Sequence, residues 1–189
     1  MLRGRFAPSP TGPLHFGSLI AATASYLEVK SQGGEWLVRM EDLDNPREVP
    51  GAADSILDML GRFGFEWDGP VLYQSQRQEA YAQAMASLHK AGLIYPCGCS
   101  RREIADSAVQ GLEGSVYPGT CRHGLGDRQA RAWRIQMDGE PVAFEDGVQG
   151  MISQHLNRDI GDFVLKRADG LFPISLRWWL TTPGRALRK

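Results

Sequence analysis

The sequence is poor in cysteine and has no long apolar run. Only three of its 189 residues are cysteine, an odd number that cannot form a complete disulfide framework. No apolar stretch approaches the roughly 20 residues that cross a bilayer, and residues 1–5 lack the apolar core of a secretion signal. We therefore expect a cytoplasmic protein in a reducing compartment, with no membrane partner.

A strong excess of charge is also absent. The net charge is −1 and the isoelectric point is near 6.4, so nothing draws the whole chain toward nucleic acid. An RNA contact would need a local basic face, and one stretch qualifies, with four arginines against one acid: Arg122, Arg128, Arg131 and Arg134 against Asp127. Charge alone favours a solvated surface there. With 42% hydrophobic residues, the chain can bury a sizeable core.

The order of predicted elements favours an α/β fold. Residues 2–6 predict a strand that ends at the proline-rich turn 8–13. A helix with apolar spacing around residues 19–30 follows and ends at Gly33-Gly34, and residues 35–40 predict a second strand. A strand, helix and strand in this order form a βαβ unit, which implies a parallel, Rossmann-type sheet. Further helices are expected at residues 53–63, from Ser75 and from Ser100, further strands at 133–137 and 163–167, and a loop-rich segment at 111–126.

The first group with chemical potential runs from Arg5 to Ser18. A helix that begins after the first strand of a parallel sheet offers unpaired N–H groups and a favourable dipole to phosphate. Gly17 would let a nucleotide approach the backbone, and His15 could stabilise charge on a transferred phosphoryl group. Taken alone, a His-x-Gly sequence is better explained as a surface connection.

The second group is the acidic turn that follows residues 35–40. Glu41, Asp42 and Asp44 would lie at the carboxyl end of the second strand, where ligands bind in open α/β sheets. The alternative is an acidic loop that is merely solvated.

The third group contains all three cysteines, as Cys97-x-Cys99 and Cys121. Zinc prefers four ligands at tetrahedral angles and binds thiolates well, so a fourth ligand is needed. His123 is the ordinary choice on chemistry alone. Three free thiols are an equally good explanation of the residues by themselves.

The stretch from Arg5 to Ser18 resembles the HIGH signature region of class I glutamyl-tRNA synthetases, with Ser18 at the variable last position. The segment Arg39 to Asp44 is similar to the R-x-E-D-x-D segment of the same enzymes. The resemblance implies that ATP binds at Pro8, His15, Gly17 and Ser18, with His15, Gly17 and Ser18 acting in catalysis. It implies that glutamate binds at Arg5, Phe6, Ala7, Pro8, Ser9 and Glu41. Within that set, Arg5 would pair with the side-chain carboxylate and Glu41 with the ammonium group.

From Leu2 to Phe172 the chain is most similar to the glutamyl-queuosine tRNA(Asp) synthetase subfamily, which lacks an anticodon-binding domain. Shared segments include 42–53, 74–77 and 162–172. The resemblance implies one zinc ion held by Cys97, Cys99, Tyr117 and Cys121, ATP with Mg²⁺ as substrate, and glutamate transfer to the queuosine of tRNA(Asp) by a monomer. It divides the chain into half of a Rossmann-type domain at 1–95 and a zinc-containing, acceptor-like insertion at 96–172. A catalytically incomplete remnant and a fragment of an ordinary glutamyl-tRNA synthetase are the alternatives.

The resemblance stops after Phe172. Residues 173–189 combine adjacent tryptophans with arginines and no clear period, so we expect an aberrant tail. Codons can be chosen for residues 173–184 so that a shifted frame gives Y-Q-F-A-V-V-V-D-D-A-G, the strand typical of the subfamily. We therefore hypothesise a frameshift, which the nucleotide sequence around Phe172 would test. Because the second signature, a KMSKS-type loop, does not follow, we expect this chain to activate glutamate poorly.

Overall fold

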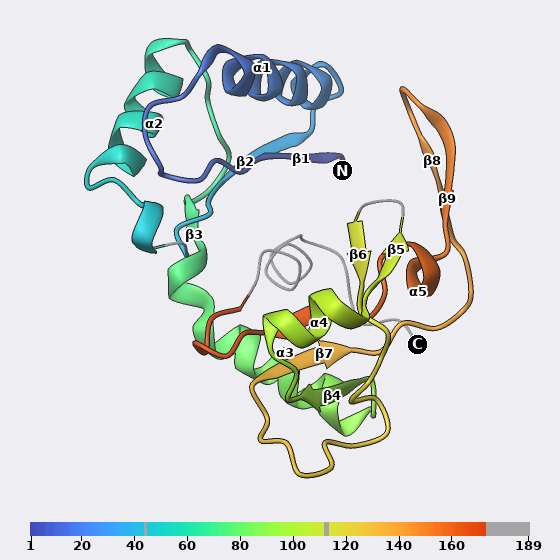
Figure 1. Ribbon diagram of the computed structural model, residues 1–189. Helices are drawn as coiled ribbons and strands as arrows, with labels where there is room; N and C mark the ends of the chain where they lie inside the picture. Colours follow the sequence, from blue (N-terminus) through green and yellow to red (C-terminus); the bar gives the residue numbers. More distant parts are fainter. Residues whose placement is uncertain (44, 112–113, 173–189) are drawn as a thin grey trace. The chain divides into compact units, whose positions relative to one another are not determined.

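A computed structural model describes residues 1–43, 45–111 and 114–172 (Figure 1). It separates two compact units, residues 1–78 and the residues from Glu79 onward. The boundary predicted at residue 95 falls within the second unit, in strand β4 (Ile94–Cys97). The predicted aberrant tail, residues 173–189, lies outside the described residues.

The first unit is built on a parallel sheet, as predicted. β1 pairs in parallel with β2 and β2 with β3, with Arg3 opposite Glu35 and Arg39 opposite Leu72. Each parallel pair is joined by a crossover that contains a helix. The elements follow in the order β1 (Arg3–Phe6), α1 (Phe16–Ser31), β2 (Glu35–Met40), η1 (Asn45–Arg47), α2 (Ala52–Arg62), β3 (Leu72–Tyr73) and η2 (Gln74–Arg77).

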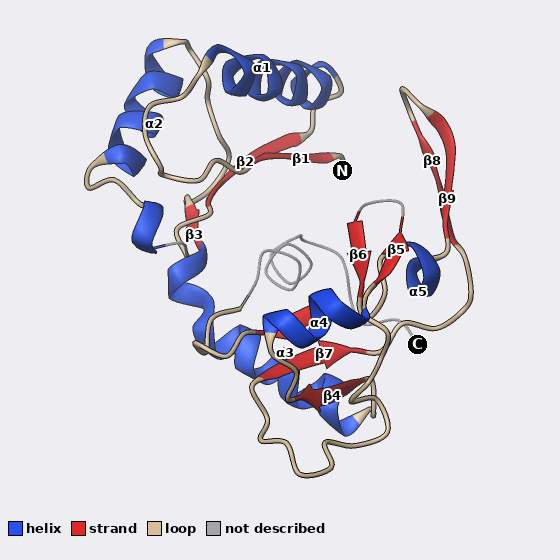
Figure 2. Cartoon of the chain, in the orientation of Figure 1, coloured by secondary structure: helices blue, strands red, loops and turns tan. Residues whose placement is uncertain are grey.

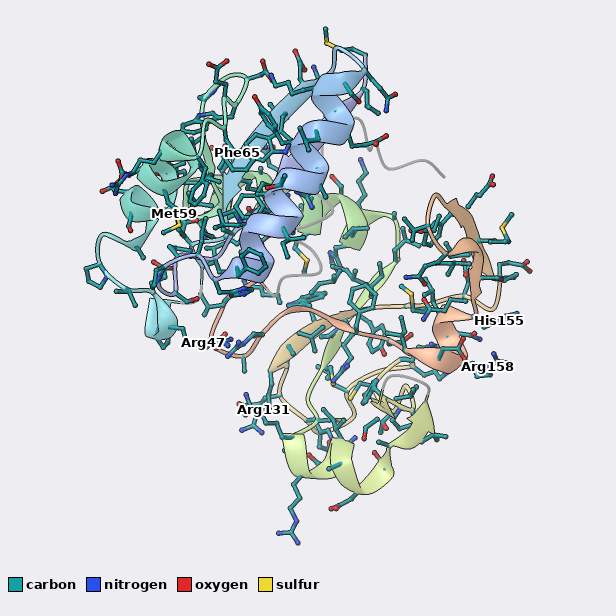
Figure 3. All side chains as sticks on the ribbon, turned by 90° about the horizontal axis from the view of Figure 1, so that it is seen from above. Arg47, Met59, Phe65, Arg131, His155 and Arg158 are labelled. Carbon is teal, nitrogen blue, oxygen red and sulfur yellow. The ribbon has the colours of Figure 1, made fainter. Side chains whose placement is uncertain are left out.

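Trp36 is the centre of the first unit's core. Its side chain is fully buried and stacks with two other aromatic rings, at centroid distances of 6.2 Å from Phe6 and 5.5 Å from Phe65. Figure 3 shows Phe65 beside the helix α1, where the ring of Tyr26 meets it edge-on at 5.2 Å. Burying one such side chain contributes about 2 kcal/mol. The remaining buried members of this core come from both helices and from β2: Ala22, Val29, Val38, Met40, Ile56 and Leu60.

The second unit contains antiparallel strands. β4 pairs with β7 and β7 with β10, while two further hairpins, β5–β6 and β8–β9, stand as separate ribbons (Figure 2). Leu88, Ile94 and Leu165 form the core beneath the three-stranded sheet. The elements are α3 (Gln78–Lys90), β4 (Ile94–Cys97), α4 (Arg101–Ser107), β5 (Val109–Gly111), β6 (Gly114–Val116), β7 (Ala132–Ile135), β8 (Val142–Asp146), β9 (Gly150–Gln154), α5 (Leu156–Asp159) and β10 (Val164–Lys166).

Helix termini test the cap predictions directly. Gly33, after α1, has a φ of 65°, the left-handed conformation that only glycine adopts readily. Ser100 caps α4 in a capping box with Glu103, as predicted. The cap predicted at Ser75 is wrong: Ser75 lies inside η2, and its hydroxyl donates to the Asp42 carboxylate over 2.5 Å.

Among the described helices, none is long and apolar enough to cross a membrane.

Candidate functional site

The loop after β1 is held in place by the segments that follow β2. Proline cannot donate to a sheet, so Pro8 and Pro10 end the strand. The carbonyl groups of both prolines accept backbone hydrogen bonds, Pro8 from the Glu41 N–H at 2.9 Å and Pro10 from the Val49 N–H at 3.0 Å. The two groups that the sequence analysis selects, Arg5 to Ser18 and the acidic turn, are therefore in direct contact through their backbones.

A pocket of about 550 Å³ lies at the junction of this loop with the start of α1. It is at the carboxyl end of β1, where ligands of open α/β sheets bind. Its lining includes seven of the residues expected to bind ATP or glutamate: Phe6, Ala7, Pro8, Ser9, His15, Gly17 and Ser18. Arg5 is half-buried on β1 and Glu41 follows β2, and neither is among the described residues that line the pocket.

His15 is the N-cap of α1. Its Nδ1 accepts a hydrogen bond from the Ser18 N–H at 3.1 Å, and its Nε2 lies 3.1 Å from the Ser18 hydroxyl. Because Nδ1 accepts, the neutral ring carries its proton on Nε2 and donates it to the hydroxyl. The ring is exposed to solvent, so it can turn toward a ligand in the pocket.

Gly17 is required by the same ring. A Cβ atom added at this position would lie 3.1 Å from both Cε1 and Nδ1 of His15. Ordinary van der Waals contact would need a few tenths of an ångström more, so a side chain at residue 17 displaces the histidine. Gly17 therefore leaves room for the His15 ring in its capping position as well as leaving the backbone open.

The acidic turn is engaged in internal contacts. Arg39, buried on β2, donates to Glu41 Oε1 over 2.6 Å, and the Glu41 side chain is itself only 12% exposed. Asp42 accepts both the N–H and the hydroxyl of Ser75. Asp42 therefore has a structural role, whereas Glu41 is an anion beside the loop of Pro8. Asp44 lies outside the described residues.

The three cysteines and Tyr117 come together in the second unit. The three Sγ atoms lie within 4.8 Å of one another, with Cys99 3.6 Å from Cys121. Tyr117 Oη lies 3.5 Å from Cys97 Sγ and 3.4 Å from Cys99 Sγ. A zinc ion with tetrahedral bonds of about 2.3 Å to sulfur and 2.0 Å to oxygen sets sulfur–sulfur edges of about 3.8 Å and sulfur–oxygen edges of about 3.5 Å. The residues thus fit a zinc ion, and His123 is not a member of this group among the described residues.

The pKa values of two thiols in this cluster shift in opposite directions. Burial would raise the pKa of the Cys121 thiol, but hydrogen bonds from Tyr117, from the Gly98 N–H and from the other two cysteines outweigh it and lower the pKa to about 7. Burial raises the pKa of Cys99. Because metal ligation requires thiolates, the lowered pKa of Cys121 favours ligation by this residue near neutral pH.

Asp162 joins several residues near this cluster through hydrogen bonds. Its side chain is fully buried and accepts four hydrogen bonds: from Tyr95 Oη at 2.5 Å, Arg122 Nε at 3.0 Å, Arg122 Nη2 at 2.6 Å and the Met137 N–H at 2.8 Å. Its backbone carbonyl accepts from Arg134 Nη1, whose guanidinium lies 3.9 Å from the centre of the Tyr117 ring. Burial would raise the pKa of Asp162, but the hydrogen bonds outweigh it and lower that pKa.

Sequence reasoning missed Tyr95 and the structural role of Asp162. It included Asp162 only as the first residue of a segment shared with a subfamily. Tyr95 and Asp162 are 67 positions apart, and no local pattern joins them. The stretch expected to be a solvated basic surface is also wrong at two positions, because Arg134 is 6% exposed and Arg122 is paired with Asp162.

Curated proteins similar to this chain share more than half of their aligned residues with it. The chain is 66% identical over 177 residues to the glutamyl-Q tRNA(Asp) synthetase of Dechloromonas aromatica, covering 92% of this chain and 59% of that protein. It is 59% identical over 177 residues to the protein of the same name from Chromobacterium violaceum, again covering 59% of the relative. The chain therefore spans about six tenths of the length of these curated relatives.

Solved structures and the family comparison agree on the fold. A glutamate tRNA ligase from Elizabethkingia meningosepticum, crystallised in complex with its amino acid, matches with a TM-score of 0.76 and 26% identity, over 95% of this chain and 41% of that one. Residues 1–173 match the family described as tRNA synthetases class I (E and Q), catalytic domain. The expected class I, Rossmann-type fold is confirmed, and the chain belongs to the class I tRNA synthetase family of the glutamate and glutamine type.

Proposed function

We propose that the protein to which this chain belongs activates glutamate with ATP and transfers it to the queuosine of tRNA(Asp). The observation that carries the proposal is the pocket of about 550 Å³ at the start of α1, lined by His15, Gly17 and Ser18. A parallel sheet, a pocket at its carboxyl edge and a helix N-terminus together suit a nucleotide phosphate. The 66% identity to a protein named glutamyl-Q tRNA(Asp) synthetase supports the choice of RNA.

In this proposal the chain positions two substrates and supplies no nucleophile. The α-carboxylate of glutamate attacks the α-phosphorus of ATP, so that glutamyl-AMP forms and pyrophosphate leaves. His15 and Ser18 donate hydrogen bonds to the phosphoryl oxygens, while Gly17 keeps the backbone accessible. Mg²⁺ bound to ATP neutralises triphosphate charge. In the second step the activated carbonyl passes to a hydroxyl of queuosine, and AMP leaves.

Glutamate recognition is assigned to Arg5, Glu41 and the loop 6–9. An arginine suits the planar side-chain carboxylate through paired hydrogen bonds. Glu41, held next to Pro8 by a backbone hydrogen bond, is the anion for the substrate ammonium group. Since Arg39 already binds Glu41 Oε1, the second carboxylate oxygen is the one assigned to the substrate.

Zinc is assigned to Cys97, Cys99, Tyr117 and Cys121, whose spacing fits a tetrahedral ion. A bound zinc ion would cross-link residues that lie up to 24 positions apart in the sequence, and its role would be structural. We also assign residues 96–172 to a tRNA-facing insertion, residues 1–95 to the nucleotide-binding half domain, and the protein to the cytoplasm as a monomer.

Replacing Gly17 by alanine should weaken binding of a non-hydrolysable glutamyl-adenylate analogue by roughly tenfold to a hundredfold, because the His15 ring must move. Isothermal titration with the wild-type and variant chains measures this directly and needs no turnover. Gly61→Ala is the matched control: it is also helical, but an added Cβ meets nothing within 4 Å. Equal affinities of wild type and Gly17→Ala would show that the present position of the His15 ring does not contribute to binding the analogue.

The choice of RNA is tested with labelled glutamate, ATP and a stoichiometric amount of protein. Label should enter tRNA(Asp) that carries queuosine, but neither tRNA(Asp) without queuosine nor tRNA(Glu), because the accepting hydroxyl belongs to the modified base. Transfer to tRNA(Glu) would instead identify an ordinary glutamyl-tRNA synthetase. Tight binding of the analogue without transfer to any RNA would support the adenylate site and refute the assigned acceptor.

A further inference from the structure

A second pocket, of about 330 Å³, lies beside the cysteine cluster in the second unit. Ligand sites in proteins usually start at this size. Four arginines line it, with one carboxylate, that of Asp169. The arginines are Arg101, Arg131, Arg134 and Arg167. An excess of guanidinium groups around a pocket of this volume indicates an anionic ligand, because like charges gathered without one repel each other.

Arg134 gives the pocket a prepared hydrogen-bond donor. Its side chain is buried, its Nη1 donates to the Asp162 carbonyl over 2.7 Å, and its plane lies over the Tyr117 ring. Its Nε is buried and has no hydrogen-bond partner among the described residues. A buried donor left unsatisfied costs about 1–3 kcal/mol, so a ligand acceptor that reaches this nitrogen would gain that much.

The other three arginines are exposed, and they differ in whether they form an ion pair. Arg167 is paired with Asp169 over 2.6 Å, which offsets part of its charge. No ion pair involves Arg101 or Arg131 among the described residues, and Figure 3 shows the Arg131 side chain projecting from the ribbon. The backbone of Arg131 is fixed, since its N–H donates to the Cys97 carbonyl at 2.9 Å. The pocket thus combines one buried guanidinium with two available charges held on ordered backbone.

We propose that this pocket binds a backbone phosphate of RNA, an inference that rests on the proposed function for the identity of the polymer. Guanidinium groups suit phosphate because their forked N–H donors match two oxygens at once. The competing explanation is that the arginines only offset the thiolate charge of the neighbouring metal site. The two explanations differ in whether removing an exposed arginine changes RNA affinity or zinc content.

The test is RNA binding by the full chain, measured as fluorescence anisotropy of labelled tRNA(Asp) over a series of salt concentrations. Arg101→Ala and Arg131→Ala should each weaken binding by about tenfold at low salt. Each should also reduce the slope of log K against log salt by about 1, the signature of a lost phosphate contact. Arg102→Ala is the matched control, because Arg102 is on the same helix and 92% exposed but does not line the pocket.

Inorganic phosphate distinguishes the source of the anion. At constant ionic strength, phosphate should displace the wild-type RNA complex more than chloride does, and the two pocket variants should lose this difference. Equal effects of Arg101→Ala and Arg102→Ala would overturn the proposal in favour of diffuse surface charge. Loss of phosphate binding with unchanged RNA affinity would overturn it in favour of a small phosphorylated ligand.

Two further results separate this inference from its premises. Lower zinc content in Arg131→Ala, with unchanged RNA affinity, would overturn the phosphate site and support charge compensation of the thiolates. Wild-type chain that binds RNA through this pocket, yet transfers no glutamate, would support the site and refute only the proposed function. Failure of the wild-type chain to bind tRNA(Asp) would overturn the inference itself.

Discussion

Asp162→Asn should lower the free energy of unfolding of the second unit by about 3 kcal/mol. The carboxylate is fully buried and accepts hydrogen bonds from the Tyr95 hydroxyl, from Nε and Nη2 of Arg122 and from the Met137 N–H. Asparagine keeps one acceptor oxygen, but it places an NH₂ group against donors and leaves the Arg122 charge without its partner. Because Arg122 is 31% exposed, water screens part of that charge, and the loss belongs at the lower end of the range for broken buried pairs.

Urea unfolding followed by circular dichroism measures the loss, with hydrogen exchange in β4 and β7 to assign it to the second unit. Asp106→Asn is the control, since Asp106 pairs with Arg102 at 3.8 Å on an exposed helix face, and it should change stability by less than about 0.5 kcal/mol. A difference below about 1 kcal/mol between wild type and Asp162→Asn would show that the buried pair does not hold the unit together.

The same pair predicts a pH dependence. The pKa of Asp162 is held below its usual 3.8, so the folded state binds its proton less readily than the unfolded state does. The stabilisation is therefore complete above the unfolded pKa and is lost as the pH falls through about 4 toward the lower folded pKa. The stability gap between wild type and Asp162→Asn should narrow in that range and stay constant near neutrality.

The first unit was predictable because its signals are local. Alternation in residues 35–40 buries Trp36, Val38 and Met40 on one face of β2, and glycines mark the helix ends. The apolar spacing in residues 19–30 predicts the helix but not which of its residues are buried: α1 buries Ala22 and Val29, whereas Ile20 and Leu27 remain more than half exposed. A helix face with small side chains can approach a sheet closely, so the size of the apolar side chains was a poor guide to which face of the helix packs.

The second unit was harder because its contacts are distant in sequence. The strand β6 lies in the segment expected to be loop-rich, β5 ends at the first residue of that segment, and the hairpin β8–β9 was not predicted at all. The pair Asp146-Gly147, where β8 passes into its turn, is a hairpin signal that could have found it. No such signal exists for the contacts of Asp162, because its hydrogen-bond partners come from three separate segments, around Tyr95, Arg122 and residues 134–137.

The pocket at the start of α1 illustrates how far sequence reasoning reaches. Its residues lie within one stretch, 6–21, so a motif and a helix start were enough to select most of the residues expected to bind ATP or glutamate. The packing of Arg39 against Glu41 was not foreseen, because an arginine on a strand is normally expected at the surface. Its burial follows from the acid two residues later, which supplies the charge that a buried arginine requires.

Cys121→Ala should abolish zinc binding, whereas the wild-type chain should retain one zinc ion. Among the three cysteines, Cys121 has the thiol with the pKa lowered to about 7, and its own N–H donates to Tyr117 Oη at 2.9 Å. At free zinc 1,000 times above the dissociation constant, the bound ion stabilises the fold by about 4 kcal/mol, and the variant loses that increment. Zinc content by mass spectrometry and the melting temperature with and without chelator measure both effects.

The fourth ligand is decided by a pair of further variants. Tyr117→Phe removes the oxygen that lies 3.5 Å and 3.4 Å from two of the sulfurs, so zinc should dissociate faster and at a lower chelator concentration. His123→Ala should leave zinc retention unchanged, because His123 does not belong to the cysteine group. The opposite result, with His123→Ala losing zinc and Tyr117→Phe keeping it, would mean that the chain rearranges around the metal and that imidazole completes the site. Since phenylalanine preserves the ring under Arg134, a loss in Tyr117→Phe can be attributed to the oxygen and not to packing.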